Sequence, residues 1–208
     1  MHQAQHTSEG SQSNIDLKSP LAWSLASTPI GFGGELNEDD RVYGYKRAKL
    51  SWYNIDPIFY VNKPAGIDDN DISTNKTRRI FSQELFPNTD IPQGQTNVIN
   101  TLDLTYYPRE RGPYNYNPVA ATNNQFPTID APNNWGGIMR AINTTNFEQS
   151  NVEYVQFWMM DPYFGSTTDV TNPSNTGTLT LNLGEISEDI LKDGRKLYEN
   201  GLPENGGT

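Results

Sequence analysis

The chain has 208 residues, a formal net charge of −10, no cysteine and only two histidines. This composition excludes disulfides and thiolate metal sites, nearly excludes a histidine-based triad or zinc site, and argues against nucleic acid, whose phosphates need clustered Lys and Arg. Aromatic residues make up 11%, alongside 17 Gly and 14 Pro, so we expect an ordered, turn-rich β domain rather than a disordered chain.

Both ends of the chain are polar. We expect residues 1–18, which contain both histidines, to be a disordered or appended tail, residues 19–203 to form a single domain, and residues 204–208 to be a second tail. No export signal is visible, and no apolar run approaches the roughly 20 residues of a membrane helix. We therefore interpret the chain as a piece of a larger protein.

Short strands are predicted along the whole chain. Strand-forming aromatic and β-branched residues fill 42–55, a polar loop is expected at 62–79, and apolar residues alternate over 98–106. Further strands are expected at the following segments: WGGIMRAI (135–142), NVEYVQFWMM (151–160) and GTLTLNLG (177–184). Residues 152–160 are apolar on both faces, which predicts a strand buried on both sides.

One helix is predicted near the C-terminus. Ser187 can cap it, acidic residues follow in its first turn, and Gly201 ends it. Many short strands separated by Pro, Gly and Asn turns indicate an antiparallel β-sandwich or jelly roll, with this single helix at its end.

The acidic loop offers the one candidate metal site. Asp68, Asp69 and Asp71 could supply oxygen ligands for calcium. The EF-hand pattern fails, however, because the loop has neither Gly at the sixth position nor Glu at the twelfth. A solvated loop is the better interpretation, and no cofactor other than calcium is considered.

Catalysis by paired carboxylates is the weakest hypothesis. Glycosidases hold two such groups about 5 to 9.5 Å apart, and the candidates here are Asp103, Glu110, Glu153 and Asp161. The sequence gives no distance between them, and each has a structural alternative. We therefore expect a protein that is not an enzyme.

The aromatic residues could form the core of the domain or bind sugars, and the basic residues could lie at a strand edge. Phe157 and Trp158 lie inside a predicted strand and are expected in the core, whereas loop residues Tyr114 and Tyr116 are expected to be more exposed. Exposed rings on a jelly roll could stack on sugars, so a carbohydrate-binding module of the cell envelope is the alternative function. The basic group at 46–49 is expected to alternate in and out of a strand edge.

Four long motifs occur in one order and together resemble the SprA/Sov family, the giant outer-membrane proteins of Bacteroidetes. The resemblance runs from about residue 21 to 203 and is carried by these stretches: RAKLSWYNIDPIFY, LDLTYYPRERGPYNYNP, NWGGIMRAINTTNFEQSNVEYVQFWMMDPYF and LNLGEISEDILKDGRKLYENGLP. The third and fourth also resemble, more weakly, a galactose-binding-like jelly roll.

The resemblance implies a part in protein transport. The family forms the translocon of the type IX secretion system, which is linked to gliding motility, and its members are very large outer-membrane β-barrels. This chain lacks the lipid-facing alternation of a barrel wall, so the resemblance implies an extramembrane domain on the cell-surface or periplasmic side. Such a domain would shape or gate the channel, and its partners would be other secretion-system subunits and secreted cargo.

Two loops are the candidate partner contacts. The first joins a stiff backbone to aromatic and Arg side chains, types enriched at interfaces, and contains Arg109, Glu110, Arg111, Tyr114 and Tyr116. The second is the polar loop at 68–79. An equally good interpretation of the first loop is a rigid turn packed on its own domain.

Overall fold

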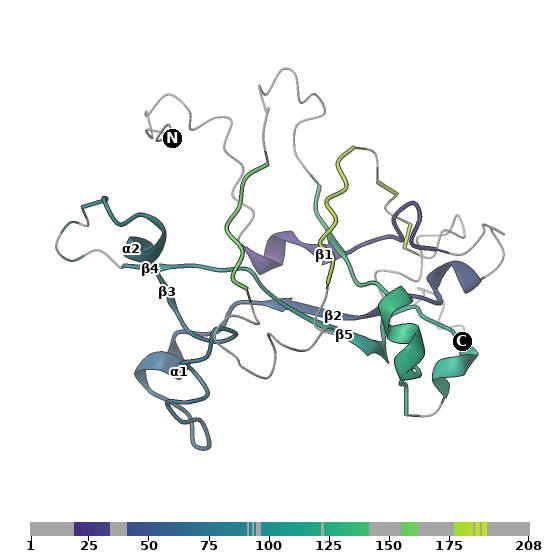
Figure 1. Ribbon diagram of the computed structural model, residues 1–208, viewed down its shortest axis with the longest axis horizontal. Helices are drawn as coiled ribbons and strands as arrows, with labels where there is room; N and C mark the ends of the chain where they lie inside the picture. The colour runs from purple at the N-terminus through teal and green to yellow at the C-terminus, as the bar shows by residue number, and fades with distance from the viewer. Residues whose placement is uncertain are drawn as a thin grey trace, which may run out of the picture. The chain divides into compact units, whose positions relative to one another are not determined.

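The computed structural model describes residues 19–33, 41–90, 92, 94, 97–121, 123–141, 155–161, 177–184, 186–187 and 189–190. Its contacts divide the chain into two compact units. The first contains Met1–Ser19, Asn54–Asp103 and Ile142–Leu179, and the second contains Pro20–Tyr53, Leu104–Ala141 and Thr180–Thr208. Figure 1 labels α1, α2 and the strands β1 to β5, and the two units are described separately below.

The first unit is built around a small hairpin. Strand β3 (Ile80–Phe81) pairs antiparallel with β4 (Val98–Ile99), so that Ile80 lies opposite Ile99. Two short helices accompany it, α1 (Ile58–Val61) and α2 (Ser82–Leu85), and α2 begins directly after β3 (Figure 1). Just before α1, the Asp56 carboxylate accepts the Ile58 backbone N–H at 2.8 Å, and Pro57 is the N-cap of the helix.

The second unit contains two antiparallel strand pairs. Strand β1 (Ser24–Leu25) pairs with β6 (Ile138–Met139), and β2 (Ala48–Tyr53) lies beside β5 (Asp103–Arg111), whose first residue belongs to the first unit. Side chains of β2 meet those of β5 in reverse order, so this pair is antiparallel too. Four 3₁₀ turns connect the strands: η1 (Pro20–Ala22), η2 (Arg41–Gly44), η3 (Pro118–Ala121) and η4 (Thr128–Asn133).

The core of the second unit surrounds Trp135. This ring is buried and meets the edge of Phe32, with the ring centroids 6.1 Å apart. The other buried apolar side chains of the described residues are Ala26, Tyr43, Ala48, Phe126 and Ile190. Gly112 allows the chain to close over β2, because a Cβ there would lie 2.7 Å from the Ala48 carbonyl carbon.

Several expectations are confirmed in the described residues. The structure contains small antiparallel sheets and few helices, in broad agreement with the mainly-β class. Strands occur at 48–53, 98–99, 103–111 and 138–139, and residues 62–79 contain neither helix nor strand. Residues 41–44 form η2 instead of a strand, because the chain turns there and the Val42 carbonyl accepts the Tyr45 N–H at 3.0 Å.

The expectation of a buried strand at 152–160 is wrong for its described part. Residues 155–161 belong to no strand, and Phe157, Trp158 and Met159 are 54, 65 and 70% exposed. Residues 177–184 likewise form no strand, and Leu179, Leu181 and Leu183 are exposed. An apolar pattern shows only that a segment is stabilised when other residues bury its side chains. The described residues do not bury the side chains of these two segments.

Other expectations fall outside the described residues. They include the tails at 1–18 and 204–208, the greater part of the helix after Ser187, and Glu153. At the start of the predicted helix, the Ser187 hydroxyl accepts the Asp189 backbone N–H at 3.1 Å. None of the helices in the described ranges has the length and apolar character that crossing a membrane demands.

Candidate functional site

The charged residues of the first candidate loop bind within their own unit. Arg109 donates from Nε to the Phe126 carbonyl at 3.3 Å, and Arg111 donates to the Asn117 carbonyl at 2.9 Å. Glu110 forms an ion pair with Lys49 across β2 and β5, with the two charged atoms 2.7 Å apart. These three side chains therefore tie the end of β5 to the segments around it.

The remainder of this loop is a rigid turn. Tyr114 has a left-handed φ of 56°, and Asn115 is buried, with its amide donating to the Tyr45 carbonyl at 3.0 Å and to the Arg47 carbonyl. Tyr114 is half-buried, whereas Tyr116 is 45% exposed. Of the five predicted contact residues, Tyr116 is thus the one that presents a large part of a ring to the surface.

Arg47 lies beneath this turn and is only 1% exposed. Its guanidinium donates to the Ala26 carbonyl, to the Ile190 carbonyl at 3.1 Å and to the Thr28 hydroxyl at 3.4 Å. It also stacks on Trp135, with Cζ 4.8 Å from the ring centroid. The expectation that the basic group at 46–49 alternates at a strand edge is therefore wrong for Arg47, which is a core residue.

The acidic loop uses its carboxylates within the loop itself. Asp68 accepts the backbone N–H groups of Asn70 and Asp71 at 2.7 and 3.1 Å, and Asp71 accepts the N–H of Asp68 at 2.9 Å. Asp69 forms an ion pair with Lys63. Within the described ranges, no group of three or more His, Cys, Asp or Glu side chains is arranged to hold a metal ion. Asp68, Asp69 and Asp71 are therefore not brought together as the calcium hypothesis requires.

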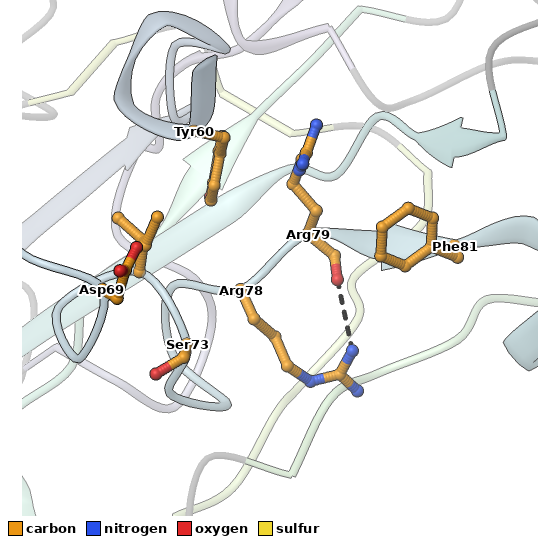
Figure 2. Close-up of a pocket in the computed structure, with 7 residues that line it drawn as sticks. Tyr60, Asp69, Ser73, Arg78, Arg79 and Phe81 are labelled. Atoms are coloured by element: carbon orange, nitrogen blue, oxygen red, sulfur yellow. Dashed lines mark hydrogen bonds between the residues drawn. The ribbon is translucent and has the colours of Figure 1, made fainter. Parts of the chain in front are cut away.

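The same region of the first unit forms an open hollow of about 370 Å³. We call it the Tyr60–Phe81 pocket, and it is lined by Tyr60, Asp69, Ile72, Ser73, Arg78, Arg79 and Phe81. Figure 2 shows Arg79 between the Tyr60 and Phe81 rings, while Arg78 extends away on the other side of the backbone. The Arg79 Cζ lies 5.0 Å from the Tyr60 centroid and 5.8 Å from the Phe81 centroid.

Arg78 is held by an ion pair with α2. Its guanidinium lies 2.9 Å from the Glu84 carboxylate and also donates to the Arg79 carbonyl at 3.2 Å. Hydrogen bonds from the Arg78 side chain and from the Phe81 backbone N–H hold the pKa of Glu84 below its usual value. The wall of the pocket is thus fixed through the start of α2.

Asp103 and Glu110, two of the four carboxylates considered for catalysis, have structural partners. Asp103 accepts hydrogen bonds from the Thr101 hydroxyl and the Ile55 backbone, and burial raises its pKa. Glu110 pairs with Lys49, which raises the pKa of the Lys49 ammonium. Burial also raises the pKa of the Tyr106 phenol, to about 12. Each carboxylate is therefore part of the local framework.

Sequence reasoning missed two features of these units. Arg47 gives no local signal, because its acceptors come from residues 26, 28 and 190. The Tyr60–Phe81 pocket joins residues of α1, the polar loop and β3. The spacing of Arg79 and Phe81, two residues apart in extended chain at the start of β3, is the one sequence signal for the pocket, since such side chains project to one face.

Comparisons with known proteins give two negative findings. No protein-family model matches the chain, and no curated protein matches it. The function proposed for the chain therefore depends on its sequence motifs and on the geometry of its two units.

Proposed function

We propose that the chain is a non-enzymatic, extramembrane domain of an outer-membrane protein-secretion translocon of the type IX system. In this proposal the domain shapes or gates the channel and contacts other subunits or cargo. The observation that carries the proposal is the set of four long motifs, which occur in the order found in the SprA/Sov family. A role in gliding motility would follow from the same assignment.

The structural setting of the second motif supports a framework role over a catalytic one. The ERGPYNY stretch wraps over the backbone of β2, where Gly112 donates its N–H to the Arg47 carbonyl at 3.1 Å. Asn115 closes the same turn from a buried position. Residues held this firmly by their own unit serve stability and the placement of the loop.

The third and fourth motifs support a contact role. Apolar side chains are exposed at Val155 and at each of residues 157–160 in the third motif, and at Leu181 and Leu183 in the fourth, whereas Trp135 and Ile190 of the same motifs are buried. Exposed apolar side chains that follow one another along a segment mark surfaces that another polypeptide covers. A domain that is one part of a much larger protein would receive this cover from neighbouring segments or from a partner subunit.

The proposal also includes a larger β fold, into which the two-stranded sheets would be incorporated. In it, residues 152–160 and 178–183 become strands of an antiparallel sandwich or galactose-binding-like jelly roll when neighbouring chain pairs with them. The pattern of 152–160 has two apolar faces and that of 178–183 has one, and pairing would satisfy the backbone and cover these apolar side chains together.

The experiment alters the contact segment in the parent protein. Phe157, Trp158 and Met159 are all changed to Ser, and secretion of a reporter cargo is measured beside the amount of the parent protein in the outer membrane. We expect secretion to fall while that amount is retained. The matched control changes Leu21 and Ile30 to Ser, two equally apolar and almost fully exposed side chains outside these segments, and should secrete normally.

Normal secretion by the triple variant at wild-type protein level would contradict the proposal. So would tight binding of the isolated chain to a glycan array that Tyr116→Ala abolishes, because that result favours the carbohydrate-binding alternative.

A further inference from the structure

The Arg79 guanidinium lies between two rings and has no hydrogen-bond acceptor among the described residues. Its Cζ lies near the Tyr60 and Phe81 ring centroids (Figure 2), and Arg79 is one of the residues that line the Tyr60–Phe81 pocket. Among the described residues, no carboxylate or carbonyl accepts a hydrogen bond from this side chain. A half-buried cation in this position is ready to receive an anion.

The other charges around the pocket are already engaged. Arg78 is paired with Glu84, and Asp69 is paired with Lys63. The carboxylates of Asp68 and Asp71 accept backbone N–H groups of their own loop. Arg79 is therefore the one charged side chain of the described pocket lining that has no ion-pair partner among the described residues.

The size and lining of the pocket select the kind of anion. A single guanidinium matches a carboxylate, which it can bind through two parallel hydrogen bonds. A phosphate dianion would meet a single cation for its two charges, and the Asp69 carboxylate repels a dianion more strongly than a singly charged carboxylate. The rings and Ile72 form an apolar wall, which suits an apolar side chain next to the bound carboxylate.

We propose that the Tyr60–Phe81 pocket binds a carboxylate of a partner polypeptide, with Arg79 as the residue that receives it and an apolar neighbour of the carboxylate packed on Tyr60, Ile72 and Phe81. The carboxylate comes from an Asp or Glu side chain or from the partner's C-terminus. This inference depends on the geometry of the first unit alone and holds whether or not the domain belongs to a secretion translocon.

The test is an NMR titration of the whole 208-residue chain with three small probes. N-acetyl-leucine supplies a terminal carboxylate beside an apolar side chain, N-acetyl-Leu-Asp-Leu-amide supplies an internal one, and N-acetyl-leucine amide has no charge. We expect at least one of the two acids to shift the Arg79 Nε–H signal in a saturable way, and the neutral amide to leave it unmoved. The acid that binds more tightly identifies the source of the carboxylate.

Three variants locate the binding. Arg79→Gln should weaken binding of the acid about tenfold or more, because a hydrogen-bonded charge pair is worth more than about 1.4 kcal/mol. Arg79→Lys keeps the charge but not the planar fork, and should fall between wild type and Arg79→Gln. The matched control, Lys76→Gln, removes one positive charge from the same loop outside the pocket lining and should bind like wild type.

The Phe81 and Ile99 amide signals report on whether each variant keeps the β3–β4 pair. Equal binding of the acid and the neutral amide would overturn the inference, as would wild-type binding by a folded Arg79→Gln variant. Tighter binding of inorganic phosphate than of either acid would overturn the choice of carboxylate. If Arg79→Gln loses the β3–β4 pair, the Arg79→Lys variant decides, and wild-type affinity there would contradict the bidentate contact.

Discussion

At the scale of single residues, the central feature is the buried cation Arg47. Its guanidinium satisfies the carbonyls of Ala26 and Ile190 and stacks on Trp135, so it joins segments that are far apart in the sequence. A buried charge is costly unless its hydrogen bonds are made. Arg47 therefore stabilises the second unit only as long as those acceptors stay in place.

Replacement of Arg47 by Met should destabilise the chain by about 2–4 kcal/mol, because it leaves buried carbonyls without donors while keeping most of the volume. Urea unfolding followed by circular dichroism measures this change. Lys49→Met is the control, since Lys49 lies two residues away and is exposed, and it should change stability much less. Equal effects of both substitutions would contradict the role given to Arg47.

A second prediction at the residue scale concerns Glu84 and the pH dependence of stability at the start of α2. The pKa of its carboxyl is lowered by hydrogen bonds from Arg78 and the Phe81 N–H. A lowered pKa means that the ionised form is favoured by folding, so this stabilisation is present above the usual value of 4.5 and is lost as pH falls through the folded-state pKa. The start of α2 should therefore loosen only in acid.

The Phe81 amide shift follows this titration directly, because that N–H donates to the Glu84 carboxylate at 2.9 Å. We expect a midpoint below 4.5 and its disappearance in Glu84→Gln. A midpoint at or above the ordinary Glu value would show that the ion pair with Arg78 does not persist in solution.

At the scale of elements, local patterns predict strands well where their neighbours lie within the same unit. The alternating and aromatic residues of 48–53 and 103–111 form β2 and β5, which pair with each other. The same kind of pattern fails at 155–160, whose apolar faces meet no described strand. The sequence of a segment shows whether its side chains favour burial in a sheet. Whether the segment forms a strand depends on a second segment that pairs with it.

The two tryptophans of these regions offer a matched test. Trp158 is 65% exposed and Trp135 is buried, so Trp158→Ala should change stability by no more than about 0.5 kcal/mol and Trp135→Ala should cost about 3 kcal/mol or more. Acrylamide quenching of Trp158→Phe and Trp135→Phe gives a second readout. The first substitution should remove a strongly quenched component, and the second a protected one.

A large loss of stability in Trp158→Ala would contradict the description of 155–161 as an uncovered segment. It would instead favour the buried strand that the apolar pattern of residues 152–160 predicts.

The site was predictable from sequence only in part. The charges of the polar loop at 68–79 indicate a contact site, but its carboxylates serve turns, and the residue that we propose to bind an anion is Arg79, at the end of the loop. The Arg109–Tyr116 segment was singled out by its composition, which suits an interface and a rigid turn equally well. Which side chains are left without partners depends on contacts between distant segments, and these are absent from any local pattern.

At the scale of the whole molecule, the two units differ in how well they are buried. Every fully buried side chain found among the described residues belongs to the second unit, whereas exposed apolar side chains occur in both. A polypeptide that leaves so much apolar surface uncovered is suited to assembly with further chain. This agrees with the proposal that it functions as one domain of a far larger outer-membrane protein.

The most direct measurement of that proposal is an immunoblot of fractionated cells, using an antibody raised against the polar loop at 68–75. The account predicts a band in the outer-membrane fraction at a mass many times the 23.4 kDa of this chain, with cargo secretion lost when the encoding segment is deleted. A band near 23.4 kDa in the soluble fraction, with secretion intact after deletion, would contradict it.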